Sequence, residues 1–519
     1  MSKQVKALIA CAVVLVLVGG ILAGILLLVP EENGDSASSS ASSQAAEALV
    51  NKNISELESI TITNEDDSYM ATLATSGNLV INGLEDFAKN DEAYDELNAI
   101  AASITYSKII DENPADPSEY GLDPAAATMD VTYTDGLAYT LEVGVTCPGT
   151  EFRYARKKGE DAVFLLNTSV ECLFYTKAEY VSKNIFTAEG DTAQVDVQDI
   201  TLGGTVRPEE IHIQRNSNTS DTNPLRLMNH IITAPVKTPA RNELATAFSA
   251  CMGTIDAVKV VAVEPTEEQL AEYGLADPYS SAVFTVEAPD ISSSLESSAT
   301  ESSSSQAQSS EEGAEEKMLT SSGSLVLGGK DEDGNYYAME QDGRVVYTVR
   351  ANSVPWAEWQ MTDIINASPA LVDITYIDSV EVKASGLDVT FTPSIIENEE
   401  TGERVLADSN SEKQSQANGE DIPDTTMFYW YQALQYVTVD GLSDKEPTGE
   451  PILTYKLNIA DGAGSIEYKF YQDTDRTCLL TIEGIEGELP VYTVQSKKVE
   501  SFIQKTKDAM EGKEIDSTL

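Results

Sequence analysis

The sequence predicts an α+β protein: three consecutive repeats of a mainly antiparallel sheet with packed helices, after one N-terminal transmembrane helix. The first observation behind this prediction is a repeated tetrapeptide, because VYTV occurs at Val346–Val349 and again at Val491–Val494. In both places another valine follows five residues after the last one, and a segment able to form a helix begins there. A looser version of the pattern spans Ala162–Val170.

A second tetrapeptide, EYGL, occurs at Glu119–Leu122 and at Glu272–Leu275, and each copy is followed by a proline and an alternating strand pattern. Matching blocks in matching order indicate one supersecondary unit used several times. We interpret the tyrosines of both copies as packing residues, expect the glycines to adopt a positive φ, and expect the leucines to be buried. The residues of this structural motif are Tyr120, Gly121, Leu122, Tyr273, Gly274 and Leu275.

The third observation is an uncharged apolar run at Ala7–Val29, which is long enough to span a bilayer as a helix. Lys3 and Lys6 precede it and acidic residues follow it, so the positive-inside rule places residues 1–6 in the cytoplasm and the rest of the chain outside. A cleaved signal peptide is the alternative. Its apolar region is usually shorter than this one, which favours an uncleaved anchor.

The rest of the chain divides by composition. Residues 30–50 are rich in serine and alanine and predict a flexible linker. We expect the three repeat units at residues 51–190, 191–370 and 371–519. The chain carries 86 acidic and 33 basic residues, for a formal net charge of −53. Such a surface repels nucleic acid, so no nucleic-acid partner is expected.

Each unit should read as hairpin, helix, meander and closing helix, because short alternating runs are separated by turn residues such as Asp135-Gly136. The opening hairpins are predicted at 59–63 with 69–73, 199–202 with 211–214, and 380–383 with 389–392. The first helices are predicted at 93–102, 243–252 and 427–434. The meander strands are predicted at 129–134, 139–143, 163–165, 282–287, 324–327, 336–340, 345–349, 453–459, 465–471 and 478–483. The closing helices are predicted at about 168–182, around Trp356 and Trp359, and at 498–510.

Two insertions interrupt the units. Residues 291–317 contain mostly serine and glutamate and cannot bury enough apolar surface to offset their ordering entropy, which predicts a disordered hairpin tip. Residues 393–423 form a second polar insertion. The third unit also lacks EYGL and has PTGEP at Pro447–Pro451 instead.

The sequence offers little catalytic chemistry. His212 and His230 are the two histidines, neither lies in a nucleophile context, and His212 reads as a surface strand residue. No cofactor loop or metal-ligand spacing appears, so we predict no cofactor and no metal. The run Asp331–Asn335 resembles the start of a calcium loop, but Tyr336 stands where the sharp turn needs glycine, which favours a polar turn.

Four cysteines follow the apolar run, at scattered positions without paired spacing, and we expect free, mostly buried thiols. If one disulfide bond forms, Cys147 with Cys172 is the pair that the unit boundaries favour. The densest aromatic cluster is expected on a helix. Four successive side chains cannot all face inward there, so part of the cluster should form a partner contact. Its members are Phe428, Tyr429, Trp430 and Tyr431.

The motifs follow one another in a fixed order: EYGL, proline and alternating strands, then L-x-(V/L)-G, RYA or YYA, VYTV and a closing helix. This order resembles a bacterial family, the domain of unknown function 4340 family. The resemblance covers most of residues 100–190 and 260–375, and the third unit weakly. It implies a membrane-anchored extracytoplasmic protein, often encoded beside ABC-type export permeases and gliding-motility-type auxiliary proteins. It supplies no catalytic residues.

Three hypotheses about function follow. The first is a non-enzymatic accessory or binding protein of an envelope transport system, with an ABC-type permease as its membrane partner. The second is an extracytoplasmic glycan hydrolase, which requires a cleft with two carboxylates about 5–10 Å apart. The third is a structural stalk, which requires an extended row of units without a concave surface. The ligand and the oligomeric state are left open by the sequence.

Overall fold

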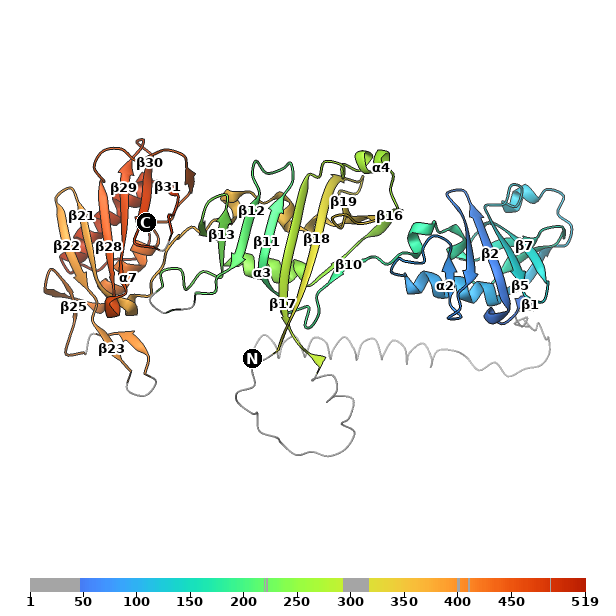
Figure 1. Ribbon diagram of the computed structural model, residues 1–519, viewed down its shortest axis with the longest axis horizontal. Helices are drawn as coiled ribbons and strands as arrows, with labels where there is room; N and C mark the ends of the chain where they lie inside the picture. Colours follow the sequence, from blue (N-terminus) through green and yellow to red (C-terminus); the bar gives the residue numbers. More distant parts are fainter. Residues whose placement is uncertain are drawn as a thin grey trace, which may run out of the picture.

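The computed structural model describes residues 47–218, 220, 223–292, 317–398, 402–408, 411–485 and 487–519. Within these ranges three nine-stranded sheets follow one another in chain order along the long axis of the molecule (Figure 1). Their neighbouring strands pair in antiparallel fashion, and few helices accompany them. The predicted α+β class with mainly antiparallel sheet is therefore confirmed.

The first sheet has the strand order β1-β5-β9-β8-β7-β6-β2-β3-β4. Its central strands alternate buried and exposed residues because one face packs on the core. Helix α2 (Asp91–Ala102) covers that face with Tyr94, Leu97 and Ile100, which confirms the predicted helix. The strands are β1 (Glu47–Asn51), β2 (Leu57–Asn64), β3 (Ser68–Leu73), β4 (Leu79–Ile81), β5 (Ser103–Asp111), β6 (Ala127–Tyr133), β7 (Ala138–Thr146), β8 (Arg153–Lys157) and β9 (Val163–Leu166).

The second sheet has the order β14-β13-β12-β11-β17-β18-β19-β20-β16. Helix α3 (Glu243–Met252) has the predicted bounds and buries Leu244, Phe248 and Met252. Two short helices accompany it, α4 (Glu267–Glu272) and α6 (Met361–Ile364). The strands are β11 (Asp196–Gly203), β12 (Ile211–Arg215), β13 (His230–Ala234), β14 (Thr238–Pro239), β16 (Lys259–Val263), β17 (Ser280–Pro289), β18 (Met318–Lys330), β19 (Tyr336–Met339), β20 (Val345–Val349) and, as a separate pair, β10 (Asn184–Thr187) with β15 (Thr254–Asp256).

The third sheet has the order β26-β25-β22-β21-β28-β29-β30-β31-β27. Helices α7 (Asp424–Gln435) and α8 (Ser496–Met510) pack on each other and confirm the predicted pair. The strands are β21 (Ile377–Ala384), β22 (Leu387–Thr392), β25 (Ser415–Ala417), β26 (Glu420–Ile422), β27 (Gly441–Ser443), β28 (Leu453–Ile459), β29 (Gly464–Gln472), β30 (Thr477–Glu483), β31 (Val491–Gln495) and, as a separate pair, β23 (Ile395–Glu397) with β24 (Arg404–Leu406).

The three sheets share one order of strands. In each, an opening hairpin pairs through its first strand with a four-stranded meander. The last strand of the meander then pairs with a strand that precedes the meander in the chain. These last strands pair as β9 with β5, β20 with β16, and β31 with β27. The order holds in the third sheet although that part of the chain has no EYGL.

Two of the predicted closing helices are wrong. Short 3-10 turns occupy Glu171–Phe174, Lys177–Tyr180 and Pro355–Glu358 instead. Around the first of them, the Thr168 hydroxyl accepts a hydrogen bond from the Thr105 backbone, and Thr176 with Glu179 forms a new capping box. Threonine side chains of this kind form hydrogen bonds with backbone groups that would otherwise continue a helix. Each 3-10 turn therefore ends after four residues.

The predicted linker ends earlier than expected. Residues Glu47–Asn51 form β1, which pairs with β5 at the edge of the first sheet. Val50 is buried there, and this small apolar gain together with the ladder hydrogen bonds orders a segment whose composition looked flexible. The polar insertion 393–423 is also structured in its described part, because β25 and β26 extend the third sheet.

Several predictions fall outside the described residues. The cytoplasmic N-terminus, the anchor at 7–29, most of the linker 30–50 and nearly all of the insertion 291–317 lie there. Within the described ranges, none of the helices combines the length and the apolar character that a membrane span requires. The four described cysteines are free thiols, three of them buried, so the Cys147–Cys172 bond does not form.

Candidate functional site

The aromatic run on α7 divides into an exposed pair and a buried pair. Phe428 is 44% exposed and Tyr429 is 40% exposed, whereas Trp430 is 0% exposed and Tyr431 is 4% exposed. The helical period of 3.6 residues turns the second pair towards the sheet. The predicted partner contact is therefore wrong for Trp430 and Tyr431, because a buried side chain cannot meet a partner in the folded protein.

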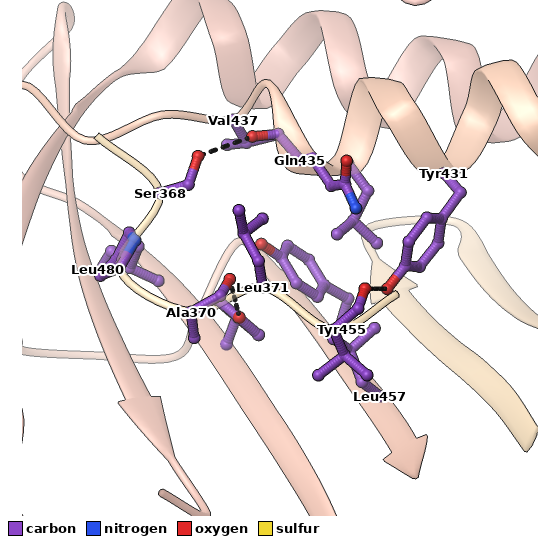
Figure 2. A pocket seen from close by; sticks show the side chains of 13 residues that line it. Ser368, Ala370, Leu371, Tyr431, Gln435, Val437, Tyr455, Leu457 and Leu480 are labelled. Atoms are coloured by element: carbon purple, nitrogen blue, oxygen red, sulfur yellow. Dashed lines mark hydrogen bonds between the residues drawn. The ribbon is translucent and has the colours of Figure 1, made fainter. Parts of the chain in front are cut away.

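Tyr431 instead holds the segment that enters the third sheet. Its hydroxyl donates to the carbonyl of Val372 at 2.7 Å, and the Tyr468 hydroxyl donates to the carbonyl of Ala370 at 3.0 Å. Figure 2 shows the hollow that these side chains surround, with Tyr431 reaching from α7 and Tyr455 beside it. The cavity measures about 20 Å³, which is room for one water molecule. We therefore interpret it as packing.

The two EYGL motifs share the conformation of their glycine and the burial of their leucine. Gly121 and Gly274 have φ values of +69° and +71°, and Leu122 and Leu275 are buried. The tyrosine rings pack against tyrosines of the meander, with 5.1 Å between the centroids of Tyr120 and Tyr154 and 4.6 Å between those of Tyr273 and Tyr337. Each motif thus fixes a turn against a meander strand.

The tyrosine carbonyl of each motif packs closely against a second glycine, in a strand of the meander. A Cβ on Gly144 would lie 2.0 Å from the Tyr120 carbonyl oxygen, and a Cβ on Gly328 would lie 2.1 Å from that of Tyr273. The next residue differs between the sheets. Gly329 donates its backbone N–H to the Tyr273 carbonyl at 2.8 Å and has open space beside it, whereas Val145 stands at the matching place in the first sheet.

Replacing Gly328 with alanine is expected to lower the free energy of unfolding by about 1–3 kcal/mol, because the added methyl group displaces the Tyr273 carbonyl. Gly329→Ala is the matched control, since its Cβ would lie 3.7 Å from that oxygen, an ordinary contact. Urea unfolding of the two variants measures the difference. Equal midpoints would contradict the close approach.

The open space at Gly329 belongs to a pocket of about 460 Å³ at the α4 end of the second sheet. Strands β17, β18 and β19 supply its polar side chains at their ends: Tyr279 stands just before β17, Lys330 ends β18, and Tyr336 begins β19. Glu358 comes from the 3-10 turn Pro355–Glu358. The volume lies in the range of small-molecule sites. We take this pocket as the candidate functional site.

Glu358 is the centre of the polar cluster. Tyr279 donates its hydroxyl to one carboxylate oxygen at 2.6 Å, and Tyr336 donates to the other. The two rings are stacked, with 6.1 Å between centroids and 17° between planes. These two hydrogen bonds hold the pKa of Glu358 below its usual value. The bond to Glu358 also raises the pKa of Tyr279 to about 12.

A single ammonium group lies against this cluster. The Nζ atom of Lys330 is 4.4 Å from the centroid of the Tyr336 ring and 3.5 Å from a Glu358 oxygen. The side chains of Lys330 and Glu358 are 45% and 57% exposed, so both groups meet solvent. A hydrogen bond with Tyr336 and the nearby carboxylate raise the pKa of Lys330. The site thus places a cation over an aromatic face and beside a carboxylate.

Arg207 fixes the turn that carries Glu358. It is 5% exposed, and its five N–H groups donate to the carbonyls of Gly203, Trp356, Ala357 and Trp359 and to the Ser280 hydroxyl. Burial lowers the pKa of Arg207 to about 10. All the N–H donors of this guanidinium are used, and they join the end of β11 to the turn Pro355–Glu358. The position of Glu358 is therefore set by Arg207, which is distant in sequence.

The other predicted chemistry lies apart from this pocket. His212 is a partly exposed strand residue, as expected, with Nε2 2.8 Å from Asp199 and Nδ1 3.0 Å from the Thr233 hydroxyl. These three side chains share the open surface of β11, β12 and β13. Asp331 accepts hydrogen bonds from the backbone of Asp333 and Asn335, which makes the calcium-like run a polar turn.

The arrangement suits binding better than proton transfer. A glycosidase acid needs a carboxyl group whose pKa is raised, whereas two tyrosines and a lysine stabilise Glu358 in its ionised form. Asp277 is a second carboxylate in the lining. Among the described residues no group of three or more histidine, cysteine, aspartate or glutamate side chains is placed to hold a metal ion.

Sequence reasoning singled out Gly274 and the YYA motif but missed Tyr279, Lys330 and Glu358 as a cluster. Tyr336 and Gly328 lie in repeated motifs and could have indicated this end of the sheet. Nothing in the sequence around Glu358 marks it, because its partners come from distant strands.

A protein-family model matches the chain. The family model described as Domain of unknown function (DUF4340) matches residues 80–278 and 231–451. Neither the curated proteins nor the solved structures gave a match to the chain. The two ranges together cover more than half of the chain and include the pocket of the second sheet.

Proposed function

The chain belongs to the DUF4340 family. The resemblance to this family implies a membrane anchor, and we propose that the chain is a membrane-anchored extracytoplasmic binding protein that acts as an accessory component of an ABC-type export system. Its work in this proposal is recognition, not catalysis. The ligand site is the pocket around Glu358, and the partner is a membrane protein.

The proposal includes three repeats of one unit after an N-terminal membrane helix. The shared strand order of the three sheets and the matching geometry of the two EYGL motifs support the repeats. The uncharged run at 7–29, preceded by Lys3 and Lys6, supports the anchor and an orientation with the sheets outside the cytoplasm.

One observation carries the binding role: the pocket presents an ionised carboxylate whose two oxygens are both occupied by tyrosine hydroxyls. Such a group cannot donate a proton at neutral pH, and its geometry is fixed before any ligand arrives. Preorganised polar groups at the wall of a 460 Å³ pocket are the usual means of orienting a small ligand. The same concave pocket argues against a plain stalk.

A second observation favours a partner protein on the third sheet. After its first residue, the partly exposed Asp424, the outward face of α7 carries no charged side chain, although 23% of the residues in the chain are charged. An uncharged aromatic face on so acidic a surface is suited to burial against another protein. The residues of this face are Thr425, Phe428, Tyr429, Gln432 and Tyr436.

A crosslinking experiment tests the partner. Benzoylphenylalanine in place of Tyr429, in the full chain and in intact cells, should form a photo-adduct with a subunit of an ABC-type permease. The same probe in place of Leu137 is the matched control, because Leu137 is similarly exposed but lies in the turn between β6 and β7 of the first sheet. Adducts of equal yield at both positions, or with soluble proteins alone, would contradict the proposal.

An activity assay tests the absence of catalysis. The purified chain should hydrolyse none of a panel of glycans, peptides and esters. Turnover that disappears in Glu358→Gln, a change that keeps the size of the side chain, would overturn the binding role in favour of the carboxylate-dependent hydrolase.

A further inference from the structure

The pocket around Glu358 already holds one ammonium group, and it holds it loosely. The Nζ atom of Lys330 touches one carboxylate oxygen at 3.5 Å, which is longer than an ordinary charge-assisted hydrogen bond. Its side chain is nearly half exposed. The side chain of such a lysine can move into solvent with little loss of stability, because exposed ion pairs contribute little to the free energy of unfolding.

The first sheet has a comparable cluster of cation, ring and carboxylate, built from other positions. There Arg153 donates to both oxygens of Glu171, at 2.7 and 2.9 Å, and its guanidinium lies 3.8 Å from the centre of the Phe174 ring. Arg153 precedes Tyr154 in the chain as Tyr336 precedes Tyr337, and Val145 fills the place of Gly329. In the first sheet, therefore, a cation of the chain itself completes a cluster of aromatic ring and carboxylate.

The second sheet differs by two changes that open this cluster. Glycine at position 329 leaves free volume beside the strand, and tyrosine at position 336 supplies a ring and a hydroxyl in place of an arginine. The second sheet also brings an aromatic face and a carboxylate together, but from other positions: the ring is that of Tyr336, at the place of Arg153, and Glu358 stands at the place of Phe174. No described side chain supplies a bidentate cation to this carboxylate. Lys330 lies there instead, with its Nζ atom 3.5 Å from one Glu358 oxygen and 4.4 Å from the centroid of the Tyr336 ring.

We propose that this pocket binds the ammonium group of a small amine, which replaces the Lys330 ammonium between the Tyr336 ring and the Glu358 carboxylate. The inference rests on the binding role proposed above and names the class of ligand. An aromatic face beside a carboxylate is the usual way in which proteins recognise primary and quaternary ammonium groups. An anion would instead meet the carboxylates of Glu358 and Asp277.

The remaining charges agree with a cationic ligand. Arg207 binds the turn that carries Glu358, and its five N–H groups all donate to carbonyls or to Ser280, so none is left for a ligand. The net charge of −53 raises the concentration of cations near the whole surface and favours their encounter with the site.

Calorimetric titration of the full chain with choline tests the proposal, with 3,3-dimethyl-1-butanol as the uncharged compound of the same shape. Choline should bind and the alcohol should not. Lys330→Met removes the internal competitor and should tighten choline binding by about tenfold, the scale of one cation–aromatic contact. Gly329→Val, which copies the first sheet, should fill the pocket and abolish binding.

The carboxylate is tested by Glu358→Gln, which should weaken choline binding by at least about tenfold. Glu332→Gln removes the same charge from the exposed turn beside the pocket and should leave choline binding unchanged. Unchanged melting temperatures show that each variant is folded, and Lys330→Met tests the idea even if Glu358→Gln unfolds.

Three results would overturn the proposal: equal binding of choline and the alcohol, binding of glucose in place of choline, or no binding of choline to either the unaltered chain or Lys330→Met. None of them bears on the crosslink from position 429. A failed titration with a positive crosslink therefore refutes the ligand class alone, and the reverse result refutes the permease partner alone.

Discussion

Trp430→Ala is expected to lower the free energy of unfolding of the third sheet and its helices by about 3–5 kcal/mol, as full truncation of a buried aromatic side chain does. The Trp430 ring stacks on Phe391 with 3.8 Å between centroids, and its Nε1–H donates to the Thr506 hydroxyl at 3.1 Å. The change leaves a cavity between α7, α8 and the sheet and removes the donor to the buried Thr506 hydroxyl, which keeps its bond to the Phe502 carbonyl.

Phe428→Ala is the matched control, because it removes an aromatic ring from the same helix, two residues away, at a position that faces solvent. Its effect should stay within about 0.5 kcal/mol. Urea unfolding followed by near-ultraviolet circular dichroism compares the two variants. A loss of equal size in both would mean that the division of the aromatic run into buried and exposed pairs is wrong.

Arg207→Ala is the second change with a large expected effect, a loss of about 3–5 kcal/mol in the second sheet. The change removes the buried donors of four carbonyls, among them those of Gly203 and Trp356, and no other described side chain is placed to donate to all of them. The turn Pro355–Glu358 should loosen, so the pocket should be lost together with stability.

Arg350→Ala provides the comparison for that change, since Arg350 is exposed at the end of β20 and its removal should be nearly neutral. Thermal unfolding and protection of the backbone amides of residues 356–359 from hydrogen exchange measure the two effects. Arg207→Ala with unchanged protection in the turn would show that the guanidinium does not position Glu358.

The elements that sequence reasoning predicted well are those with a strong period. Helix α3 has both predicted ends, and α7 and α8 lie within a few residues of theirs, because apolar residues recur there at helical spacing. The hairpins were predicted by alternation and turn residues. The closing helix at 168–182 failed because hydroxyl groups of Thr168 and Thr176 bind nearby backbone or side-chain partners that a periodic pattern does not reveal.

The candidate site could not be predicted from local sequence patterns. The hydrogen bond between Arg207 and the Trp359 carbonyl joins residues 152 positions apart in the chain. The partners of Glu358 come from the ends of three strands. Local patterns record which residues form a strand but not which strand ends meet. The aromatic run on α7 drew attention by its density alone, and only burial separated Tyr429 from Trp430.

The shared order of strands has a consequence for how the chain folds as it leaves a ribosome or crosses a membrane. Strands β5, β16 and β27 precede the meander of their sheet and wait for the last strand of that meander as a partner, so no sheet is complete before this strand has emerged. The sheets should then close one by one from the N-terminus. An export pause before β31 would leave β27 without its pairing strand and β30 with an open edge, and this is where a partly exported chain would be most prone to pair with a second copy of itself.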